Sequence, residues 1–363
     1  MVTSSNRQVC NFFPGPSALP PDVVFKVQAF VAEFQESGMS LLEISHRDPL
    51  VMDMIDETRE SLREVLKIPE DYEVLFMHGG ASTQFPLVPW NFPRLSVADY
   101  ILTGVWSQKA YEAASNIRSV RISADGGQDN FLRIPSHYEF SETADYIHLT
   151  SNNTIYGTQF HNFPSVPKGS RIVCDASSDL MGRKIEVKDF SLVYACAQKN
   201  LGMAGVTLVI IKRDILEHDT EGVPEVFRYR AHANAKSLYN TPPVLAIAVV
   251  NEMTKWIKAK GGIDEVVKIN LRKAERIYDF LDNDPNFEPL VQHDESRSWM
   301  NVCFKLSTVE MEETFLRSAN KFGFRGLRGH RKIGHFRASL YNSISEEQCR
   351  KLEEFLKNYS RTL

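Results

Sequence analysis

Short apolar segments alternate with helix-patterned segments along most of the chain. The apolar segments are nearly continuous in branched and aromatic residues, which is typical of strands covered on both faces. This alternation predicts an α/β fold with a large domain built on a mostly parallel, seven-stranded sheet between helices. The predicted strands are residues 73–77, 100–103, 119–122, 146–150, 171–174, 192–196 and 207–211.

Apolar residues spaced three and four apart, with capping signals at their ends, predict the helices. The polar segment 225–241 has no such period and is predicted to be a loop. The predicted helices of the first part are residues 21–37, 50–67, 243–260 and 263–282. The last part is predicted as a smaller α/β unit with strands 301–306 and 335–340 and helices 309–322 and 345–359.

The length of 363 residues suits two domains. We expect a large domain over residues 14–262 and a small C-terminal domain over 263–363, with residues 1–13 packing on the small one. A net charge of −4 does not favour a nucleic-acid partner. The longest apolar runs are too short to cross a membrane, and the N-terminus lacks the apolar core of a secretory signal.

Five cysteines occur without a CxxC pair, so neither a disulfide framework nor a metal site is expected. A reducing, cytoplasmic location fits this cysteine usage best.

Lys199 directly follows the apolar strand 192–196. Desolvation lowers the pKa of a lysine at the edge of an apolar interior, and the free amine is a nucleophile that forms Schiff bases with aldehydes. A lysine whose stem packs on apolar surface while its ammonium reaches water is the commoner fate of such a residue. Lys199 alone therefore does not decide between the two interpretations.

Asp175 follows the preceding strand, in the run "IVCDASSDLMGR". Parallel strands bring such residues to one edge of the sheet, where α/β proteins bind ligands. A carboxylate there can keep the ring nitrogen of pyridoxal phosphate protonated, and the protonated ring accepts electrons from a carbanion. A helix N-cap is the alternative role of this aspartate.

The run "LFMHGGASTQF" places Gly79 and Gly80 between a strand and a helix, as in sites that bind phosphate at a helix N-terminus. Many strand–helix turns use two glycines without any ligand. Trp106 follows another strand and could stack on a flat cofactor ring, although a core or interface position is commoner for a tryptophan.

Histidines and arginines gather in two further stretches. "EISHRDP" contains His46 and Arg47, and "GLRGHRKIGHFRASLYN" contains His330, Arg331 and Arg337. Arginine forks bind carboxylate and phosphate oxygens two at a time. Arg337 lies among apolar residues in a predicted strand, so it requires an anionic partner from the protein or from a substrate.

Together these stretches resemble the phosphoserine aminotransferases, pyridoxal-phosphate enzymes with the aspartate-aminotransferase-like fold. The resemblance rests on "NFFPGPSALP", "EISHR", "HGGASTQF", "NNTIYGTQF", "DASSDLMGR", "AQKNLGMAG", "YNTPP", "GHR" and "FRASLYN", which occur in the family's order over nearly the whole chain. The chain departs from the family's GGGxGQF at "GGASTQF" and from its SHRS at "SHRD".

The resemblance implies a role for each matched residue. Lys199 would bind the cofactor aldehyde and move the substrate proton, Asp175 would pair with the ring nitrogen, and Trp106 would stack on the ring. The cofactor would also be bound by Gly80, Ala81, Ser82, Thr154 and Gln198, and by Asn240 and Thr241 of the neighbouring subunit of a homodimer. Arg337 would bind the substrate α-carboxylate, and His46, Arg47, His330 and Arg331 would bind its phosphate, one pair of them across the interface.

The implied reaction moves the amino group of L-glutamate to 3-phosphohydroxypyruvate and gives O-phosphoserine and 2-oxoglutarate, a step of serine biosynthesis. Three alternatives stay open. An alanine–glyoxylate type aminotransferase would not need the His/Arg pairs, and a cysteine desulfurase would need a cysteine in a polar loop. A non-catalytic metabolite-binding relative would not need Lys199 and Asp175. A nicotinamide dehydrogenase is disfavoured because GxGxxG is missing.

Overall fold

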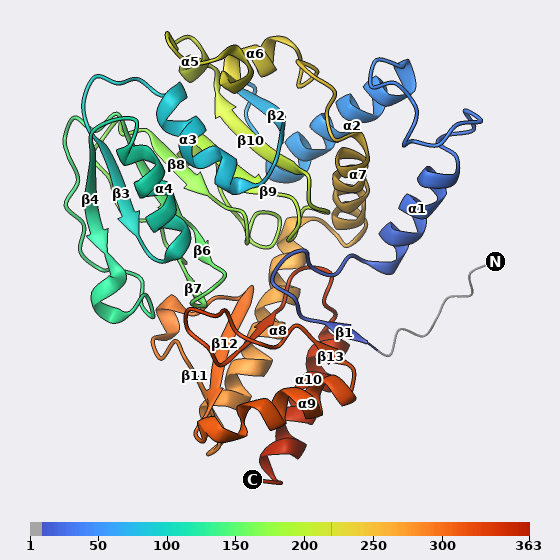
Figure 1. Ribbon diagram of the computed structural model, residues 1–363, viewed down its shortest axis with the longest axis vertical. Coiled ribbons are helices and arrows are strands. Elements are labelled where there is room, and N and C mark those ends of the chain that lie inside the picture. The colour runs from blue at the N-terminus through green and yellow to red at the C-terminus, as the bar shows by residue number, and fades with distance from the viewer. Residues whose placement is uncertain (1–8, 219) are drawn as a thin grey trace.

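A seven-stranded sheet forms the centre of the computed structural model, which describes residues 9–218 and 220–363 (Figure 1). Its strand order is β2-β10-β9-β8-β5-β3-β4, and only β10 runs antiparallel to its neighbours. The predicted, mostly parallel sheet is therefore confirmed. Its strands are β2 (Tyr72–His78), β3 (Ala98–Leu102), β4 (Val120–Asp125), β5 (Tyr146–Thr150), β8 (Ile172–Asp175), β9 (Leu192–Cys196) and β10 (Val206–Lys212).

Helices cover both faces of this sheet (Figure 1). Alternate residues of β2 show the two faces, because Val74 and Phe76 pack with α2 and α7 while Leu75 and Met77 pack with α3 and α4. This burial on both faces explains the nearly continuous apolar strands of the sequence. The helices are α1 (Pro21–Ala32), α2 (Pro49–Leu66), α3 (Ala81–Asn91), α4 (Val105–Ser115) and α7 (Val244–Ala259).

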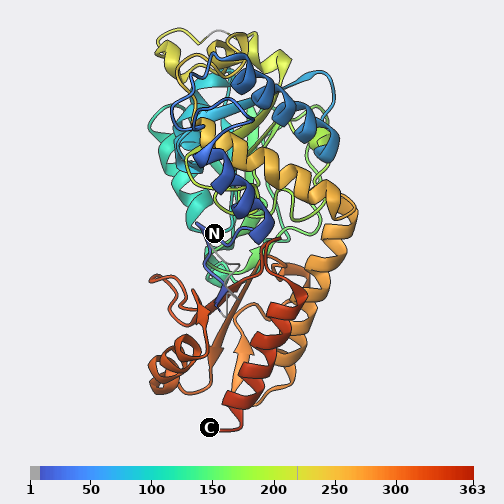
Figure 2. The same cartoon turned by 90° about the vertical axis from the view of Figure 1, so that its right-hand side faces the viewer.

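A second hydrophobic cluster lies in the C-terminal third of the chain. It surrounds the antiparallel sheet β11-β12-β14 and the helices α8, α9 and α10. Figure 2 shows α8 extending from the upper part of the molecule into the lower part, with α10 beside it. The elements are α8 (Ile263–Asn283), β11 (Phe287–Pro289), β12 (Asn301–Leu306), α9 (Glu312–Lys321), β14 (Phe336–Ser339) and α10 (Glu346–Ser360).

The N-terminal segment joins this second cluster. Strand β1 (Cys10–Asn11) pairs in parallel with β13 (Phe324–Arg325), as Figure 1 shows. Cys10 and Phe12 are buried among residues of α8, α9 and α10. The two ends of the chain thus contribute to one core. Within the described residues, none of the helices has both the length and the apolar run needed to cross a bilayer.

The first helix is shorter than predicted. It ends at Ala32 instead of residue 37, because Glu33 is extended and Gln35 and Glu36 have positive φ angles. The turn buries Phe34, whose backbone N–H donates to the carbonyl of Met39. The apolar period of the sequence continues through Phe34, so it gave no sign of this turn.

The prediction of a loop over residues 225–241 is partly wrong, because α6 (Tyr229–Asn234) lies inside it. This helix is only six residues long and forms through tertiary contacts. The backbone N–H of Tyr229 donates to Asn91 Oδ1 at 2.8 Å, and its hydroxyl donates to Gln84 Oε1 at 2.7 Å. The remaining short elements are β6 (Asn152–Asn153), β7 (Thr158–Gln159) and α5 (Arg213–Leu216).

Candidate active site

Lys199 and Asp175 meet at the carboxyl edge of the central sheet. Asp175 is the last residue of β8, and Lys199 lies in the turn that follows β9, the neighbouring strand. The Nζ of Lys199 donates to the hydroxyl of Thr154 at 2.6 Å, and Thr154 follows β5, the strand on the other side of β8. The amine, the carboxylate and the hydroxyl therefore lie together at the carboxyl edge of the adjacent parallel strands β5, β8 and β9. The sequence predicts this position for Lys199 and Asp175.

Burial raises the pKa of Asp175, which is 4% exposed. Hydrogen bonds from Ser177 and the positive charge of Lys199 act in the opposite direction. The backbone N–H of Ser177 donates to Oδ1 at 3.0 Å. A buried carboxylate in this position is stabilised further by a cationic N–H donor, which is what a protonated ring nitrogen provides.

Arg337 reaches the same place from the C-terminal sheet. It is a buried residue of β14, and its Nη1 donates to the backbone carbonyl of Thr154 at 2.8 Å. Thr154 thus contacts Lys199 through its hydroxyl and Arg337 through its carbonyl. No carboxylate of the described residues lies within ion-pair distance of Arg337, and its Nε is buried without a partner. A buried guanidinium of this kind can bind a substrate carboxylate.

The N-terminus of α3 is open toward the same edge of the sheet. Gly80 is its N-cap residue and cannot cap the helix with a side chain. Gly79 has a φ of +89°, and a Cβ there would come within 2.6 Å of Thr83 Oγ1. Thr83, which replaces a glycine of the family's GGGxGQF run, therefore packs against Gly79, where a residue with a Cβ would not fit. The first N–H groups of α3 can bind a phosphate, and Ser82 is exposed beside them.

Trp106 lies in the first turn of α4 and is half-buried. Its indole Nε1 is buried and has no partner among the described residues. Lys109, one turn further along the helix, places its Nζ 5.2 Å from the centre of the indole ring.

His330 and Arg331 lie in the loop that precedes β14, the strand of Arg337. Burial lowers the pKa of His330, and the positive charges of Arg337 and Arg331 lower it further. His46 and Arg47 lie between α1 and α2, and no described contact joins them to Lys199 or Arg337. Within one chain, the predicted pair His330 and Arg331 therefore lies near Arg337, whereas no described contact places the pair His46 and Arg47 there.

Comparison with known proteins assigns the chain to a family. The family model described as "Aminotransferase class-V" matches residues 9–352. The chain belongs to the class-V aminotransferases. Among curated members, this class-V aminotransferase is 44% identical to the phosphoserine aminotransferase of Halalkalibacterium halodurans, with 98% of this chain and 99% of that protein covered.

Solved structures agree with this assignment. The phosphoserine aminotransferase of Bacillus circulans subsp. alkalophilus is 39% identical and superposes with a TM-score of 0.95, covering 98% of this chain and 99% of that one. The pyridoxal-phosphate-bound phosphoserine aminotransferase of Trichomonas vaginalis is 34% identical, with a TM-score of 0.91 over 96% and 99% of the two chains. Within class V, the chain belongs to the phosphoserine aminotransferases, so the predicted family, fold and enzyme class are confirmed.

The residues of this class-V aminotransferase fit pyridoxal phosphate. An amine, a buried carboxylate, an open helix N-terminus and a half-buried indole lie at one edge of the sheet. Gln198 is next to Lys199, and its Oε1 is buried without a partner. Asn240 and Thr241 are exposed, and the carbonyl of Thr241 lies 2.8 Å from His78 Nε2, at the end of the strand that precedes Gly79.

Sequence reasoning missed the N-terminal segment as part of the site. The hydroxyl of Ser17 donates to the carbonyl of Lys199 at 2.7 Å, and its N–H donates to the carbonyl of Gln198 at 2.9 Å. A Cβ on Gly15 would lie 3.3 Å from the Cγ of Lys199. Only the family resemblance of "NFFPGPSALP" pointed to this segment, because the contacts join residues more than 180 positions apart.

A buried lysine on α8 was missed as well. The Nζ of Lys273 donates to the backbone carbonyls of Leu340, Tyr341 and Ile344 at 2.8, 2.9 and 2.9 Å. In the turn that it holds, the N–H of Asn342 donates to Asn200 Oδ1 at 3.0 Å. Asn200 directly follows Lys199, so this turn connects the C-terminal unit to the loop of Lys199.

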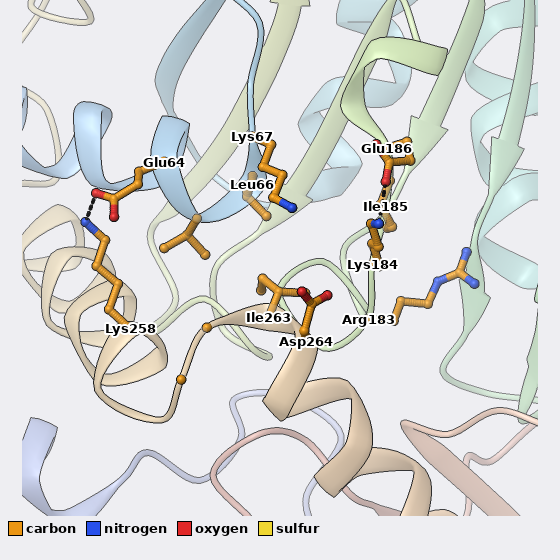
Figure 3. Close-up of a pocket in the computed structure, with 13 residues that line it drawn as sticks. Glu64, Leu66, Lys67, Arg183, Lys184, Ile185, Glu186, Lys258, Ile263 and Asp264 are labelled. Carbon is orange, nitrogen blue, oxygen red and sulfur yellow. Dashed lines mark hydrogen bonds and ion pairs between the residues drawn. The ribbon is translucent and has the colours of Figure 1, made fainter.

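A pocket of about 340 Å³ lies elsewhere, where α2, α7 and α8 meet the loop 183–186 (Figure 3). It contains none of the predicted site residues. Figure 3 shows its charges paired with one another: Lys258 with Glu64, and Lys184 with Glu186 at 3.0 Å. Two of its charged pairs are thus internal, and Lys67 and Asp264, which also line it, carry opposite charges (Figure 3).

Proposed function

We propose that the chain transfers the amino group of L-glutamate to 3-phosphohydroxypyruvate, giving O-phosphoserine and 2-oxoglutarate. The observation that carries this proposal is the convergence of Lys199, Asp175 and Arg337, two of them hydrogen-bonded to Thr154. The names of relatives that are about 40% identical over nearly their whole length support the same substrates. Pyridoxal phosphate, the predicted cofactor, is confirmed by the family and by the cofactor-bound neighbour.

When bound, pyridoxal phosphate supplies an aldehyde that combines with amines and a ring that accepts an electron pair from the substrate Cα. We assign the protein's part of the chemistry to three residues. Lys199 would hold the aldehyde, and its Nζ would take the proton from the substrate Cα and return it during the second half-reaction. Asp175 holds the positive charge of the ring nitrogen, and Arg337 fixes the α-carboxylate.

Thr154 prepares Lys199 for this role, because its hydroxyl accepts a hydrogen bond from Nζ at 2.6 Å. The contact orients the amine toward the edge of the sheet. The carbonyl of the same residue orients Arg337, so substrate and base are positioned relative to one backbone segment. Trp106 covers the cofactor ring, and Gly80, Ala81, Ser82 and Gln198 bind its phosphate in this proposal.

The test follows the visible absorption of the purified protein. L-Glutamate should remove the cofactor band, and 3-phosphohydroxypyruvate should restore it as 2-oxoglutarate and O-phosphoserine accumulate. Lys199→Ala should retain the cofactor without repeated turnover, and Lys168→Met, a change at an exposed residue, should behave like the unchanged protein. Repeated turnover of Lys199→Ala with glutamate would show that Lys199 is not the base.

The proposed homodimer is supported by exposed apolar side chains on one region of the surface. Phe25 is 71% exposed and Leu42 is 64% exposed, and Met39 and Met52 are exposed nearby in the chain. They belong to α1, α2 and the connection between them, which face the viewer in Figure 2. Large apolar side chains exposed together are typical of protein interfaces. The connection also carries His46 and Arg47, so we assign that pair to the partner's active site.

Complementation tests this arrangement. Lys199→Ala and Arg47→Ala should each be inactive alone. If Arg47 acts in the partner's site, a mixed dimer of the two variants contains one intact site, and random mixing restores about a quarter of the activity. If Arg47 acts in its own chain's site, every mixed site is damaged and no activity returns. Light scattering of the unchanged protein should give the mass of two chains.

The division into domains is also a proposal. We place the large domain at 14–262 and the small domain at 263–363, with residues 1–13 on the small one. Two separate hydrophobic clusters support this division, although residues 1–8 lie outside the described part. Limited proteolysis should cut first near 262. A cytoplasmic location is supported by five free, buried cysteines in the described chain, and cell fractionation tests it.

A further inference from the structure

One lysine beside the proposed active site has no assigned role. Lys109 is exposed and lies three residues after Trp106 on α4, so the two side chains share a face of the helix. Its Nζ lies 5.2 Å from the centre of the indole ring. If Trp106 covers the cofactor ring, Lys109 stands at the rim of the substrate site.

Lys109 also has no neutralising partner. Across the described residues, no carboxylate lies within ion-pair distance of its ammonium, whereas exposed lysines such as Lys184 and Lys268 pair with nearby glutamates. A cation–π contact does not cancel the charge. Its full positive charge is therefore available to another anion.

The loop that carries His330 approaches Lys109 from the C-terminal unit. The loop is held in a tight turn, since the N–H of Ile333 donates to the carbonyl of His330 at 3.0 Å and that of Gly329 to the carbonyl of His335 at 2.9 Å. Ile333 packs against the same hydrophobic cluster as Trp106. The loop and α4 therefore border the same part of the core, and Lys109 lies near enough to His330 for its charge to act on the imidazole.

Four positively charged side chains lie near enough to His330 for their charges to act on its imidazole. After burial, the charges of Arg337, Arg331, Lys332 and Lys109 are what lower the pKa of His330. They come from two parts of the chain that are more than 200 residues apart. Holding like charges together without counter-charges is unfavourable, so the arrangement is suited to binding an anion with more than one negative charge.

We propose that Lys109 is a further specificity-determining residue, which contacts the distal phosphate of the substrate and favours phosphate over the γ-carboxylate of glutamate. The inference rests on the proposed function. Two arginine forks and two imidazoles suffice for a carboxylate with two oxygens. A phosphate offers three oxygens and carries about −1.5 to −2 charge, so one additional point charge on a flexible stem adds more to phosphate binding than to carboxylate binding.

A different role must be separated from this one. Lys109 could act only by orienting Trp106 through the cation–π contact. In that case its loss affects every substrate alike, because the indole faces the cofactor and not the distal group. Comparing two substrates within one variant therefore distinguishes the roles.

The experiment uses the complete, cofactor-loaded enzyme with Lys109→Met, Lys109→Arg and the control Lys168→Met, which also removes one exposed, unpaired lysine charge. Single-turnover half-reactions are followed by visible absorption with O-phospho-L-serine and with L-glutamate. We expect Lys109→Met to lower kcat/KM about five- to tenfold for phosphoserine and about twofold for glutamate, from the Coulomb energy of one screened charge. Inhibition by inorganic phosphate should weaken in parallel, and Lys109→Arg should stay within about twofold of the unchanged enzyme because it retains the charge.

Equal losses with the two substrates, or no difference between Lys109→Met and Lys168→Met, would overturn the assignment of Lys109. Failure of the unchanged enzyme to react with phosphoserine would instead refute the proposed function. The two failures are thus distinguishable, since the second is seen without any substitution.

Discussion

Replacing Lys273 by methionine tests how a buried ammonium supports the fold around the catalytic loop. The lysine is fully buried, and its three N–H groups satisfy the carbonyls of Leu340, Tyr341 and Ile344. Methionine removes this donor from the carbonyls of Leu340 and Ile344, at about 1–3 kcal/mol each, whereas the carbonyl of Tyr341 still accepts from the N–H of Ile344 at 2.9 Å. Removing the buried charge offsets part of this cost. Burial lowers the pKa of Lys273 from 10.5 to about 8, which corresponds to about 3 kcal/mol.

The net expectation is a loss of about 1 kcal/mol in the free energy of unfolding, within a range from a gain of about 1 kcal/mol to a loss of about 3 kcal/mol. Urea denaturation of the holoenzyme measures it, with Lys268→Met as the matched control on the same helix. Lys268 is exposed and pairs with Glu265, so its loss should leave the free energy of unfolding nearly unchanged. A Lys273→Met protein more stable than the unchanged one by over about 2 kcal/mol, or less stable by over about 5 kcal/mol, would refute the reasoning.

The difference in stability between the unchanged protein and Lys273→Met should depend on pH. Folded Lys273 releases its proton near pH 8, whereas the unfolded lysine keeps it up to about pH 10.4. Between these values the unfolded state binds more protons, so the stability of the unchanged protein rises with pH relative to Lys273→Met. Unfolding curves at about pH 7.5 and 9.5 measure the difference. A difference that shrinks with rising pH would mean that the three carbonyls outweigh burial in setting the pKa.

Two further substitutions probe the site itself. Asp175→Asn removes the proposed negative charge opposite the ring nitrogen, and we expect it to lower kcat about 10²–10³-fold with the cofactor still bound, because one partner of a buried charge pair is lost. Single-turnover absorption with glutamate measures the effect, and a loss below tenfold would contradict the role. Arg337→Met should raise KM for glutamate and phosphoserine alike by about 10²-fold or more, because both substrates carry the α-carboxylate, and Arg337→Lys should recover only part of the loss. Steady-state kinetics measure both KM values, and an effect on phosphoserine alone would assign Arg337 to the phosphate site instead.

The sequence predicted the parts of the site that follow from strand pattern. Strand 192–196 matches β9 at both ends, and the side chains after β8 and β9 meet because parallel strands share one carboxyl edge. Contacts between distant segments could not be read in this way. Asn200 meets Asn342 across 142 positions, and nothing in either local pattern indicates the other.

Elements that depend on tertiary contacts were missed for the same reason. Helix α6 exists because Tyr229 bonds to Asn91 and Gln84, and α1 stops early because Phe34 turns into the core. No described contact joins His46 and Arg47 to Lys199 or Arg337, so their role in the site rests on the proposed homodimer.

The pairing of β1 with β13 has a consequence for the order in which the protein is made. Cys10 and Phe12 leave the ribosome early, but the core that receives them includes residues up to Tyr359. At synthesis rates of about 5–20 residues per second, the first segment waits on the order of 20–70 seconds for its partners. The C-terminal unit therefore completes its core only after Tyr359 has left the ribosome, while the central sheet, finished at Lys212, can assemble earlier.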